Sequence, residues 1–341
     1  MKALLFHQHG EEDVLSYEEL PTPEPHAGEA LVRVSASALN HLDVFVRRGW
    51  PGLRLPMPHI GGADGAGIVE RIGPGQTDFR TGDRVAIYPG ILPVEDEFTL
   101  RGDHSQSPSF YIIGEGCRGA FADYVVVPTK NLVKMPEDAT FEDTAAVQLV
   151  FLTAWRMLIT RGELRAGETV LFVGAGGVNT AALQVAKLAG AVVYMLTSSQ
   201  EKMDRAAELG ADHVLSYKTG DWLKTIQKMT GKRGVDLVVD NVGQATFQQS
   251  IMALRRGGRL VTVGGTSGPK PEIDIRYVFI KQLQIIGSTL GSPQEFREVM
   301  KLVWAGKLRP VIDREMPLEE GVEAYRLMEQ GGLFGKIVLK P

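Results

Sequence analysis

Apolar and polar positions alternate in short runs through about the first 135 residues. Residues 30–39 read ALVRVSASAL and residues 120–128 read AFADYVVVP. A period of two is typical of strands that bury one face. Turn residues, such as the Gly-Pro-Gly at 73–75, separate the runs. The pattern therefore predicts a β-rich domain at the N-terminal end of the chain.

From about residue 140 the pattern changes, and apolar runs alternate with helical segments. We expect strands at 169–173, 191–196, 213–216, 235–240, 259–263 and 283–288, and helices at about 177–189, 200–209, 220–230 and 244–255. This alternation predicts a parallel, doubly wound sheet. An amphipathic segment at 293–305 and a final strand in GKIVLK follow. The second pattern is therefore expected to form a domain inserted into the first.

Composition and charge are those of an ordinary globular protein. The 341 residues are 44% hydrophobic and 23% charged, with a formal net charge of −4, so neither disorder nor nucleic-acid binding is indicated. Cys117 is the single cysteine, which excludes an intrachain disulfide and a cysteine-rich zinc site. The chain has neither a signal peptide nor an apolar run of about 18 residues. We therefore expect a cytoplasmic protein with no membrane or nucleic-acid partner.

A glycine-rich loop follows the apolar run at 170–173. Residues 174–179 read GAGGVN, close to the G-x-G-x-x-G fingerprint of dinucleotide sites. Gly174 permits the turn, Gly176 permits close approach of a pyrophosphate, and Gly177 opens a helix. Asn179 takes the place of the third glycine, and its amide can bond to the loop or to a phosphate. We expect this loop, with Val178, to bind a dinucleotide; a strand–helix turn without a ligand is the alternative.

The residues after the second predicted strand distinguish the two nicotinamide cofactors. NAD sites usually carry an acid there, which binds the ribose 2′-hydroxyl. Here residues 197–202 read TSSQEK, and Glu201 falls in the first turn of the next helix, where it complements the helix dipole. Hydroxyl groups and a lysine suit a 2′-phosphate instead. The stretch predicts NADP(H), and the expected contacts are Thr197, Ser198, Ser199 and Lys202.

Taken in order, the motifs resemble those of the medium-chain dehydrogenase/reductase superfamily over nearly the whole chain. They are PHIGGADGAGIVERIGPG (58–75), GDRV (82–85), GAFADYVVVP (119–128), LTAW (152–155), GAGGVNTAALQVAKLAGA (174–191), LGADHVLSY (209–217), GGRLVTVGG (257–265) and FGKIVL (334–339). The resemblance implies an α/β fold. A GroES-like, β-rich catalytic domain (residues 1–137 and 287–341) would carry an inserted, doubly wound Rossmann domain (residues 138–286).

The resemblance also allows this chain to be compared with the zinc alcohol dehydrogenases of the superfamily. Asn40 stands at the place of a cysteine, Ala63-Asp64 at that of a His–Glu pair, and Leu149 at the third ligand. Alanine and leucine cannot bind a metal. Residues 90–110, where many relatives carry four structural cysteines, contain none. Their acidic residues could bind an ion, but a solvated charged loop is favoured. We therefore expect no zinc.

The chain is thus similar to the zinc-independent branch, typified by NADPH:quinone oxidoreductases. Without a metal to stabilise developing charge, the acceptor has to be a quinone, an enone or another activated carbonyl compound. Asn40 is expected to donate from its amide to a substrate oxygen; a loop cap is the alternative. His41 could relay a proton or be structural. Asp43 is expected to be structural and to pair with Lys336.

The remaining contacts and partners are implied by the resemblance alone. The cofactor contacts are Thr153 beside the nicotinamide, Tyr217 at the 2′-phosphate, Asn241 and Val242 after the fourth strand, Val263, Gly264 and Gly265 after the fifth, Ser288 and Thr289 after the sixth, and Phe334 and Lys336 near the C-terminus. A homodimer or homotetramer is implied, because edge strands such as 283–288 pair across a twofold axis in relatives. The alternatives are an alcohol or aldehyde dehydrogenase of the zinc-type lineage that lost its metal, and a non-catalytic NADPH-binding protein.

Overall fold

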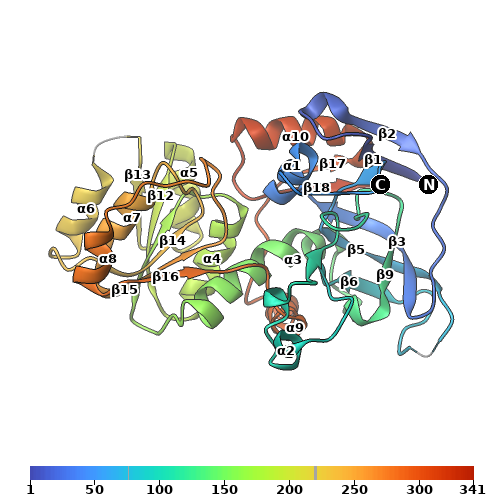
Figure 1. The fold of residues 1–341 in the computed structure, drawn as a ribbon, viewed down its shortest axis with the longest axis horizontal. Helices are drawn as coiled ribbons and strands as arrows, with labels where there is room; N and C mark the ends of the chain where they lie inside the picture. The colour runs from blue at the N-terminus through green and yellow to red at the C-terminus, as the bar shows by residue number, and fades with distance from the viewer. Residues whose placement is uncertain (76, 219–220) are drawn as a thin grey trace. The chain divides into compact units, whose positions relative to one another are not determined.

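The computed structural model describes residues 1–75, 77–218 and 221–341 (Figure 1). It consists of two compact units. Unit 1 comprises Met1–Leu149 and Gly291–Pro341, and unit 2 comprises Val150–Leu290. The family resemblance implied boundaries at 137/138 and 286/287. The units divide later in the chain, within helix α3 (Phe141–Trp155), whose first residues belong to unit 1.

Unit 1 is built on antiparallel β-structure. Its largest sheet has the order β10-β6-β5-β3-β18-β17, and β9 also pairs with β3. The strands of this sheet are β3 (Glu29–Ala38), β5 (Asp64–Ile72), β6 (Arg84–Ile87), β9 (Tyr124–Pro128), β10 (Leu132–Lys134), β17 (Ile312–Pro317) and β18 (Lys336–Lys340). A smaller sheet has the order β2-β1-β4, and two short strands form the pair β7-β8. These strands are β1 (Lys2–Phe6), β2 (Leu15–Glu19), β4 (His59–Ile60), β7 (Gly90–Ile91) and β8 (Tyr111–Ile112).

The register of the large sheet brings three chain segments together. Strands β3 and β5 are antiparallel, with Ala38 opposite Asp64. Strand β18 also runs antiparallel to β3, with Val338 opposite Ala38. The end of β3, the start of β5 and the start of β18 therefore meet at one place, although they are far apart in the sequence.

Among the described residues, four helices complete unit 1, together with the first part of α3. They are α1 (His41–Arg48), α2 (Glu97–Leu100), α9 (Pro293–Trp304) and α10 (Gly321–Gln330). Short helical turns lie at Glu12–Val14, His104–Gln106, Thr129–Asn131 and Leu318–Glu320. Helix α9 agrees with the amphipathic segment predicted at 293–305. The sequence pattern did not predict α10 or β17, because it treated this region only as a short return to the first domain.

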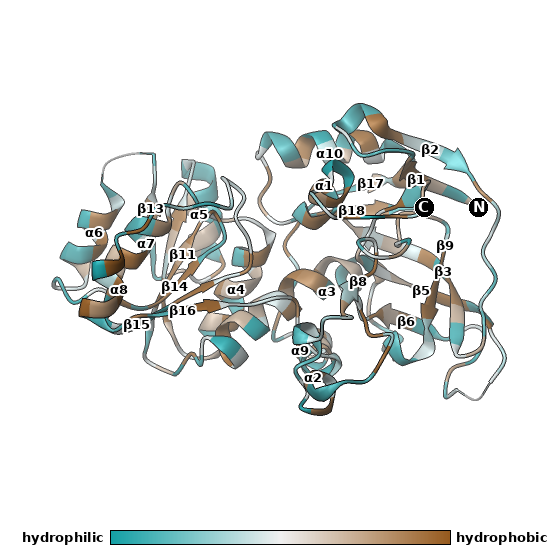
Figure 2. Cartoon of the chain, viewed as in Figure 1, coloured by the Kyte–Doolittle hydropathy of each residue, from teal (hydrophilic) through white to brown (hydrophobic). Residues whose placement is uncertain are grey.

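Unit 2 is a six-stranded parallel sheet of the order β13-β12-β11-β14-β15-β16. This is the 3-2-1-4-5-6 order of the Rossmann fold, so the predicted fold class is confirmed. The strands are β11 (Thr169–Val173), β12 (Val192–Thr197), β13 (His213–Ser216), β14 (Val235–Asp240), β15 (Leu254–Thr262) and β16 (Gln284–Gly287). The central strands β11 and β14 are strongly apolar (Figure 2), as expected for strands covered on both faces.

Helices connect these strands. They are α4 (Gly177–Leu188), α5 (Gln200–Glu208), α6 (Trp222–Met229), α7 (Phe247–Ala253) and α8 (Ile275–Lys281), and a π-helical turn, Arg156–Arg161, follows α3. The helix expected at 220–230 agrees with α6, and its first residue, 220, lies outside the described residues. Helix α8 was not predicted. Strand β15 begins at Leu254, where the sequence pattern still indicated helix.

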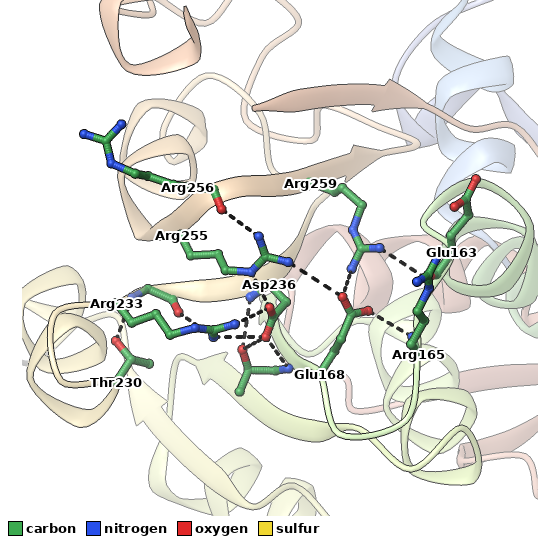
Figure 3. A network of polar contacts seen from close by, with 11 residues as sticks. Glu163, Arg165, Glu168, Thr230, Arg233, Asp236, Arg255, Arg256 and Arg259 are labelled. Carbon is green, nitrogen blue, oxygen red and sulfur yellow. Dashed lines mark hydrogen bonds and ion pairs between the residues drawn. The ribbon is translucent and has the colours of Figure 1, made fainter. Parts of the chain in front are cut away.

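A network of charged side chains joins the amino ends of β11, β14 and β15 (Figure 3). The Asp236 carboxylate accepts from the Thr169 N–H at 2.9 Å and the Thr169 hydroxyl at 2.7 Å. It also pairs with Arg233 at 2.6 Å and with Arg255. Although burial opposes ionisation, these donors hold the pKa of Asp236 well below its usual range. The network therefore holds together the amino ends of these three strands. The glycine loop lies at the opposite, carboxyl end of β11.

Candidate active site and cofactor site

A buried polar cluster lies in unit 1 where β3, β5 and β18 meet. Asn40 follows β3, Asp64 begins β5 and Lys336 begins β18, and each is at most 4% exposed. The Lys336 ammonium donates to Asp64 Oδ2 at 3.0 Å and to Asn40 Oδ1. Asn40 Nδ2 donates to Asp64 Oδ2 at 2.9 Å, and Asp64 Oδ1 accepts from the Leu149 N–H at 2.8 Å. The ammonium, the carboxylate and the amide thus satisfy one another's hydrogen-bonding groups.

The amide of Asn40 is used within the protein. Because an ammonium can only donate, the Asn40 atom that faces Lys336 has to be the oxygen. Nδ2 then faces two acceptors, Asp64 and the Ala38 carbonyl, the latter at 3.2 Å. Neither amide hydrogen remains for a substrate, so the expectation that Asn40 donates to a substrate oxygen is wrong. The sequence could not show this, because Lys336 lies 296 residues further along the chain.

Asp43 has a structural position, but its expected partner is wrong. Its carboxylate accepts from the Asn40 N–H at 2.8 Å and the Gly62 N–H at 2.9 Å, so it links the start of α1 to the segment before β5. Lys336 binds Asp64 rather than Asp43. Burial raises the pKa of Asp43 to about 7, against the opposite effect of the two N–H groups. Asp64 was not among the functional residues expected from the sequence, although an acid among small residues in GGADGAG is a signal for a role.

His41 is the accessible polar side chain next to this cluster. It is the first residue of α1, and its ring has no hydrogen-bond partner among the described residues. The residue is exposed to solvent, yet surrounding protein atoms partly desolvate its ring. This desolvation and then the charge of Lys336 lower the pKa of the imidazole. His41 is therefore neutral at pH 7, with one nitrogen able to donate and the other able to accept.

The cluster does not fit a zinc ion. Zinc takes thiolate, imidazole or carboxylate donors, whereas Asn40, Ala63 and Leu149 present an amide, a methyl group and an aliphatic side chain. The Asp64 carboxylate is already bound to an ammonium, whose charge repels a divalent cation. Within residues 1–75, 77–218 and 221–341, no three His, Cys, Asp or Glu side chains are grouped as metal ligands.

In the segment at 90–118, the Asp96 side chain forms hydrogen bonds within its own loop. Its carboxylate accepts from the Phe98 and Thr99 N–H groups, both at 3.0 Å, and from the Ser107 hydroxyl at 2.6 Å. It therefore caps α2 and closes the loop that follows. The Asp96 carboxylate is therefore occupied by groups of its own loop.

The glycine loop joins β11 to α4 in unit 2. Gly174 has φ +92°, a conformation that glycine adopts readily. A Cβ added to Gly176 would meet no protein atom within 4 Å, so the loop has open space where a phosphate would approach. Asn179 donates from Nδ2 to the carbonyls of Val173 and Gly174, both at 2.9 Å. The sequence allowed the Asn179 amide to bond either to the loop or to a phosphate. In the structure it bonds to the loop.

The residues expected at a 2′-phosphate lie at the ends of adjacent strands. Thr197 ends β12, and the Tyr217 N–H after β13 donates to the Thr197 carbonyl at 3.1 Å. Ser199 caps α5 by accepting from the Lys202 N–H at 3.3 Å. A pocket of about 500 Å³ opens here and includes Ser198 and Ser199 in its lining. Lys218 also lines this pocket; it was not among the contacts expected from the sequence, although it directly follows Tyr217.

The other expected contacts divide between the units. In unit 2, Asn241 accepts from the Val263 N–H at 2.9 Å and reaches Asn179 Oδ1 at 3.4 Å, which connects the loops after β14 and β15 to the glycine loop. Ser288 has a buried hydroxyl without a partner in the described chain, as expected for a group that a ligand satisfies. The further expected residues of unit 2 are Thr153, buried on α3; Gly177 and Val178, which begin α4; and Val242, Gly264, Gly265 and Thr289, in loops after strands. Phe334 is buried in unit 1, as is Lys336.

Comparison with known proteins gives matches over most of the chain. The model of the alcohol dehydrogenase GroES-like domain matches residues 26–137, and that of the zinc-binding dehydrogenases matches residues 177–305. A zinc-type alcohol dehydrogenase-like protein of Schizosaccharomyces pombe is 34% identical over 96% of this chain and 95% of its own. Human quinone oxidoreductase is 29% identical over 99% and 97%. A solved structure described as an NAD-dependent alcohol dehydrogenase is 42% identical, with a TM-score of 0.96 over all of both chains.

A Rossmann sheet with an open glycine loop, carried by a chain with a GroES-like unit, defines an NAD(P)-dependent oxidoreductase. This chain belongs to the medium-chain dehydrogenase/reductase superfamily. No helix among the described residues has the length and apolar character needed to cross a membrane.

Proposed function

We propose that this protein transfers hydride from NADPH to a quinone, an enone or another activated carbonyl compound, and that it does so without zinc. The observation that carries the proposal is the Asn40–Asp64–Lys336 cluster, which offers no donor set for a metal. Without a Lewis acid, the acceptor has to stabilise the developing negative charge by its own delocalisation. Quinones and enones do so, whereas simple ketones do not.

The preference for NADPH is supported by the chemistry at the ends of β12 and β13. Neither Thr197–Ser199 nor the lining of the adjoining pocket includes an acid to bind a ribose 2′-hydroxyl. We expect Lys202→Ala to weaken NADPH binding about tenfold or more, since a charge-assisted bond contributes roughly 1.5–3 kcal/mol, and to leave NADH binding nearly unchanged. Titration of both cofactors measures this. Equal losses for both cofactors would count against this assignment.

His41 is the residue that we propose to serve the substrate, because the Asn40 amide is occupied. A neutral imidazole can donate to a substrate oxygen and pass a proton to it. In an enone, the hydride would form a C–H bond at the β-carbon, the π electrons would move to oxygen, and the resulting enolate would take a proton. His41→Gln keeps a donor but removes the titrating group. The rate should therefore fall, and its dependence on pH on the acid side of neutrality, where the lowered pKa of His41 lies, should disappear.

The test of the function is NADPH oxidation against a panel of quinones, enones, aldehydes and simple ketones, with metal content measured on the same sample. We expect turnover of the first two classes, no dependence on chelators, and far less than one zinc per chain. About one zinc per chain that tracks activity through chelation would refute the proposal. An absence of turnover with tight NADPH binding would instead support a non-catalytic NADPH-binding protein.

A second candidate is an alcohol or aldehyde dehydrogenase of the zinc-type lineage that lost its metal. The zinc-type relative in Schizosaccharomyces pombe and the cysteine-free loop at residues 90–110 favour it. Oxidation of alcohols with NADP⁺ or NAD⁺ in the same panel separates the two candidates.

Assembly into a homodimer or homotetramer is proposed from an apolar surface of unit 2. Strand β16 is the edge of the six-stranded sheet, and apolar side chains lie exposed on it and nearby: Ile273, Ile275, Phe279, Ile280 and Ile285. An exposed apolar edge is a ready pairing surface. Size-exclusion chromatography with light scattering should give a dimer or tetramer, and Ile285→Lys should yield monomers.

A further inference from the structure

The pocket at the carboxyl ends of β12 and β13 has two chemically different halves. Its lining residues are Ser198, Ser199, Gln200, Ser216, Lys218 and Thr225 on the polar side, and Met203, Val214, Leu215 and Trp222 on the apolar side. None of these lining residues is acidic, and Lys218 is the one charged residue among them. Such a lining suits a ligand that joins a flat, carbon-rich group to an anion.

Two serine hydroxyls of the pocket each have a hydrogen available to donate. Ser199 Oγ accepts from the Lys202 N–H at 3.3 Å, and Ser216 Oγ accepts from the Lys218 N–H at 3.1 Å. A hydroxyl that accepts a hydrogen bond still has its own hydrogen to give. The Thr225 hydroxyl, by contrast, donates to the Asp221 carbonyl at 3.1 Å. Ser199 and Ser216 therefore each offer an O–H donor to the pocket, and Lys218 offers an ammonium. The Gln200 amide on the same side donates to Asp204 at 2.8 Å.

Asp221, the nearest acid that follows Lys218 in the described chain, is directed elsewhere. Its carboxylate caps α6 by accepting from the Lys224 N–H at 3.1 Å, and it pairs with the Lys224 ammonium at 3.0 Å. It does not line the pocket. The charge of Lys218 is therefore not offset within the pocket lining.

We propose that Lys218 determines cofactor specificity by binding the 2′-phosphate of NADPH from the β13 side of the pocket. The inference rests on the proposed use of NADPH and adds a residue to Lys202 and Tyr217, which the sequence motifs indicated. The hydroxyls of Ser199 and Ser216 supply neutral donors to the same phosphate. Hydrogen bonds from charged donors to phosphate are the strong class, so Lys218 contributes to the discrimination between phosphate and hydroxyl.

The experiment compares Lys218→Gln with Lys224→Gln by calorimetric titration of NADPH, NADH, 2′,5′-ADP and ADP. Lys224 is a matched control, because it lies on the neighbouring α6 with its side chain 82% exposed and outside the pocket. For Lys218→Gln we expect about a tenfold loss for NADPH and 2′,5′-ADP, as for one charge-assisted bond, and less than about a twofold change for NADH and ADP. Lys224→Gln should leave all four affinities unchanged.

The outcomes separate this inference from the cofactor assignment. If the unaltered protein binds NADPH no better than NADH, the proposed NADPH preference fails, and the role of Lys218 fails with it. If the preference is present but Lys218→Gln retains it, or loses all four ligands equally, only the role of Lys218 is overturned. The two fragments carry no nicotinamide, so the result does not depend on catalysis.

Discussion

Removing the buried ammonium of Lys336 is the most direct perturbation of the candidate active site. In Lys336→Met the side chain keeps much of its length but loses its charge and its donors. The Asp64 carboxylate, which has no exposed surface, then retains only the Asn40 amide and the Leu149 N–H as donors. Asn40 Oδ1 loses its donor as well. The variant therefore leaves an uncompensated charge and an unpaired acceptor in the interior.

The expected loss follows from the burial of both partners. Breaking a buried ion pair by removing one partner costs about 3–5 kcal/mol, because the remaining charge stays out of water. Replacing both partners removes this penalty. We therefore expect Lys336→Met combined with Asp64→Asn to cost less than the sum of the single changes, with a coupling energy of about 1.5 kcal/mol or more.

The assay is guanidinium unfolding of the four proteins of this cycle, followed by tryptophan fluorescence and circular dichroism. Lys340→Met is the matched control, because it makes the same change on the same strand. Lys340 pairs with Glu142 and Glu315 and its side chain is 45% exposed, so its loss should stay below about 1 kcal/mol. NADPH binding should persist in every stable variant, because the glycine loop belongs to unit 2.

Two results would refute this reasoning. The first is a Lys336→Met variant that loses less than about 1 kcal/mol, as an exposed pair would. The second is strict additivity of the two single changes, which would mean that Lys336 and Asp64 do not stabilise each other. Either result would also remove the cluster as an argument against a metal.

The remaining predictions concern the cofactor loop and the charged network of unit 2. Gly176→Val should fold, because its Cβ meets no protein atom within 4 Å. It should abolish NADPH binding, since the side chain fills the space of the pyrophosphate. Normal binding would show that the cofactor does not lie on this loop. Asn179→Gly should leave NADPH affinity within about tenfold, or 1.4 kcal/mol. The reason is that the Asn179 amide bonds to the loop carbonyls, while backbone N–H groups hold the anion. A larger loss in a titration would assign Asn179 to the phosphate. Asp236→Asn should destabilise the protein by about 1.5–3 kcal/mol at pH 7, since it removes a buried carboxylate that forms charge-assisted bonds to two partly exposed arginines. The pKa of Asp236 is lowered in the folded state, so this stabilisation is present above the unfolded value of about 4 and is lost as the pH falls further. Unfolding measured from pH 7 down to pH 3 should show the two proteins converging only below about pH 4, and a constant difference through that range would contradict the assignment.

Local periodicity was sufficient to determine the architecture of unit 2. The predicted strand at 235–240 agrees with β14 (Val235–Asp240), and the helix predicted at 177–189 agrees with α4 (Gly177–Leu188). Both are long apolar or amphipathic segments whose pattern reflects burial directly. Helix α8 was not predicted, because it has only 7 residues and no buried residue. No apolar stripe along the sequence therefore marks it.

The chemistry of the cofactor loop could also be read from the sequence, because its parts are contiguous. Gly174, Gly176 and Gly177 follow a strand and precede a helix, and that order alone implies a turn open to a phosphate. The partner of Asn179 could not be chosen in this way. Its amide is short enough to reach either the loop or a ligand, and only the path of the backbone decides that it bonds to Val173 and Gly174.

The active-site cluster was determined by the tertiary structure. Asn40, Asp64 and Lys336 were all visible as residues of family motifs, but the sequence paired Lys336 with Asp43 and left the Asn40 amide free for substrate. Antiparallel pairing of β5 and β18 with β3 brings the three side chains into contact from widely separated parts of the chain. An ammonium buried at such a junction takes the acceptors that the sheet register places within reach, and distance along the chain carries no information about which acceptors those are.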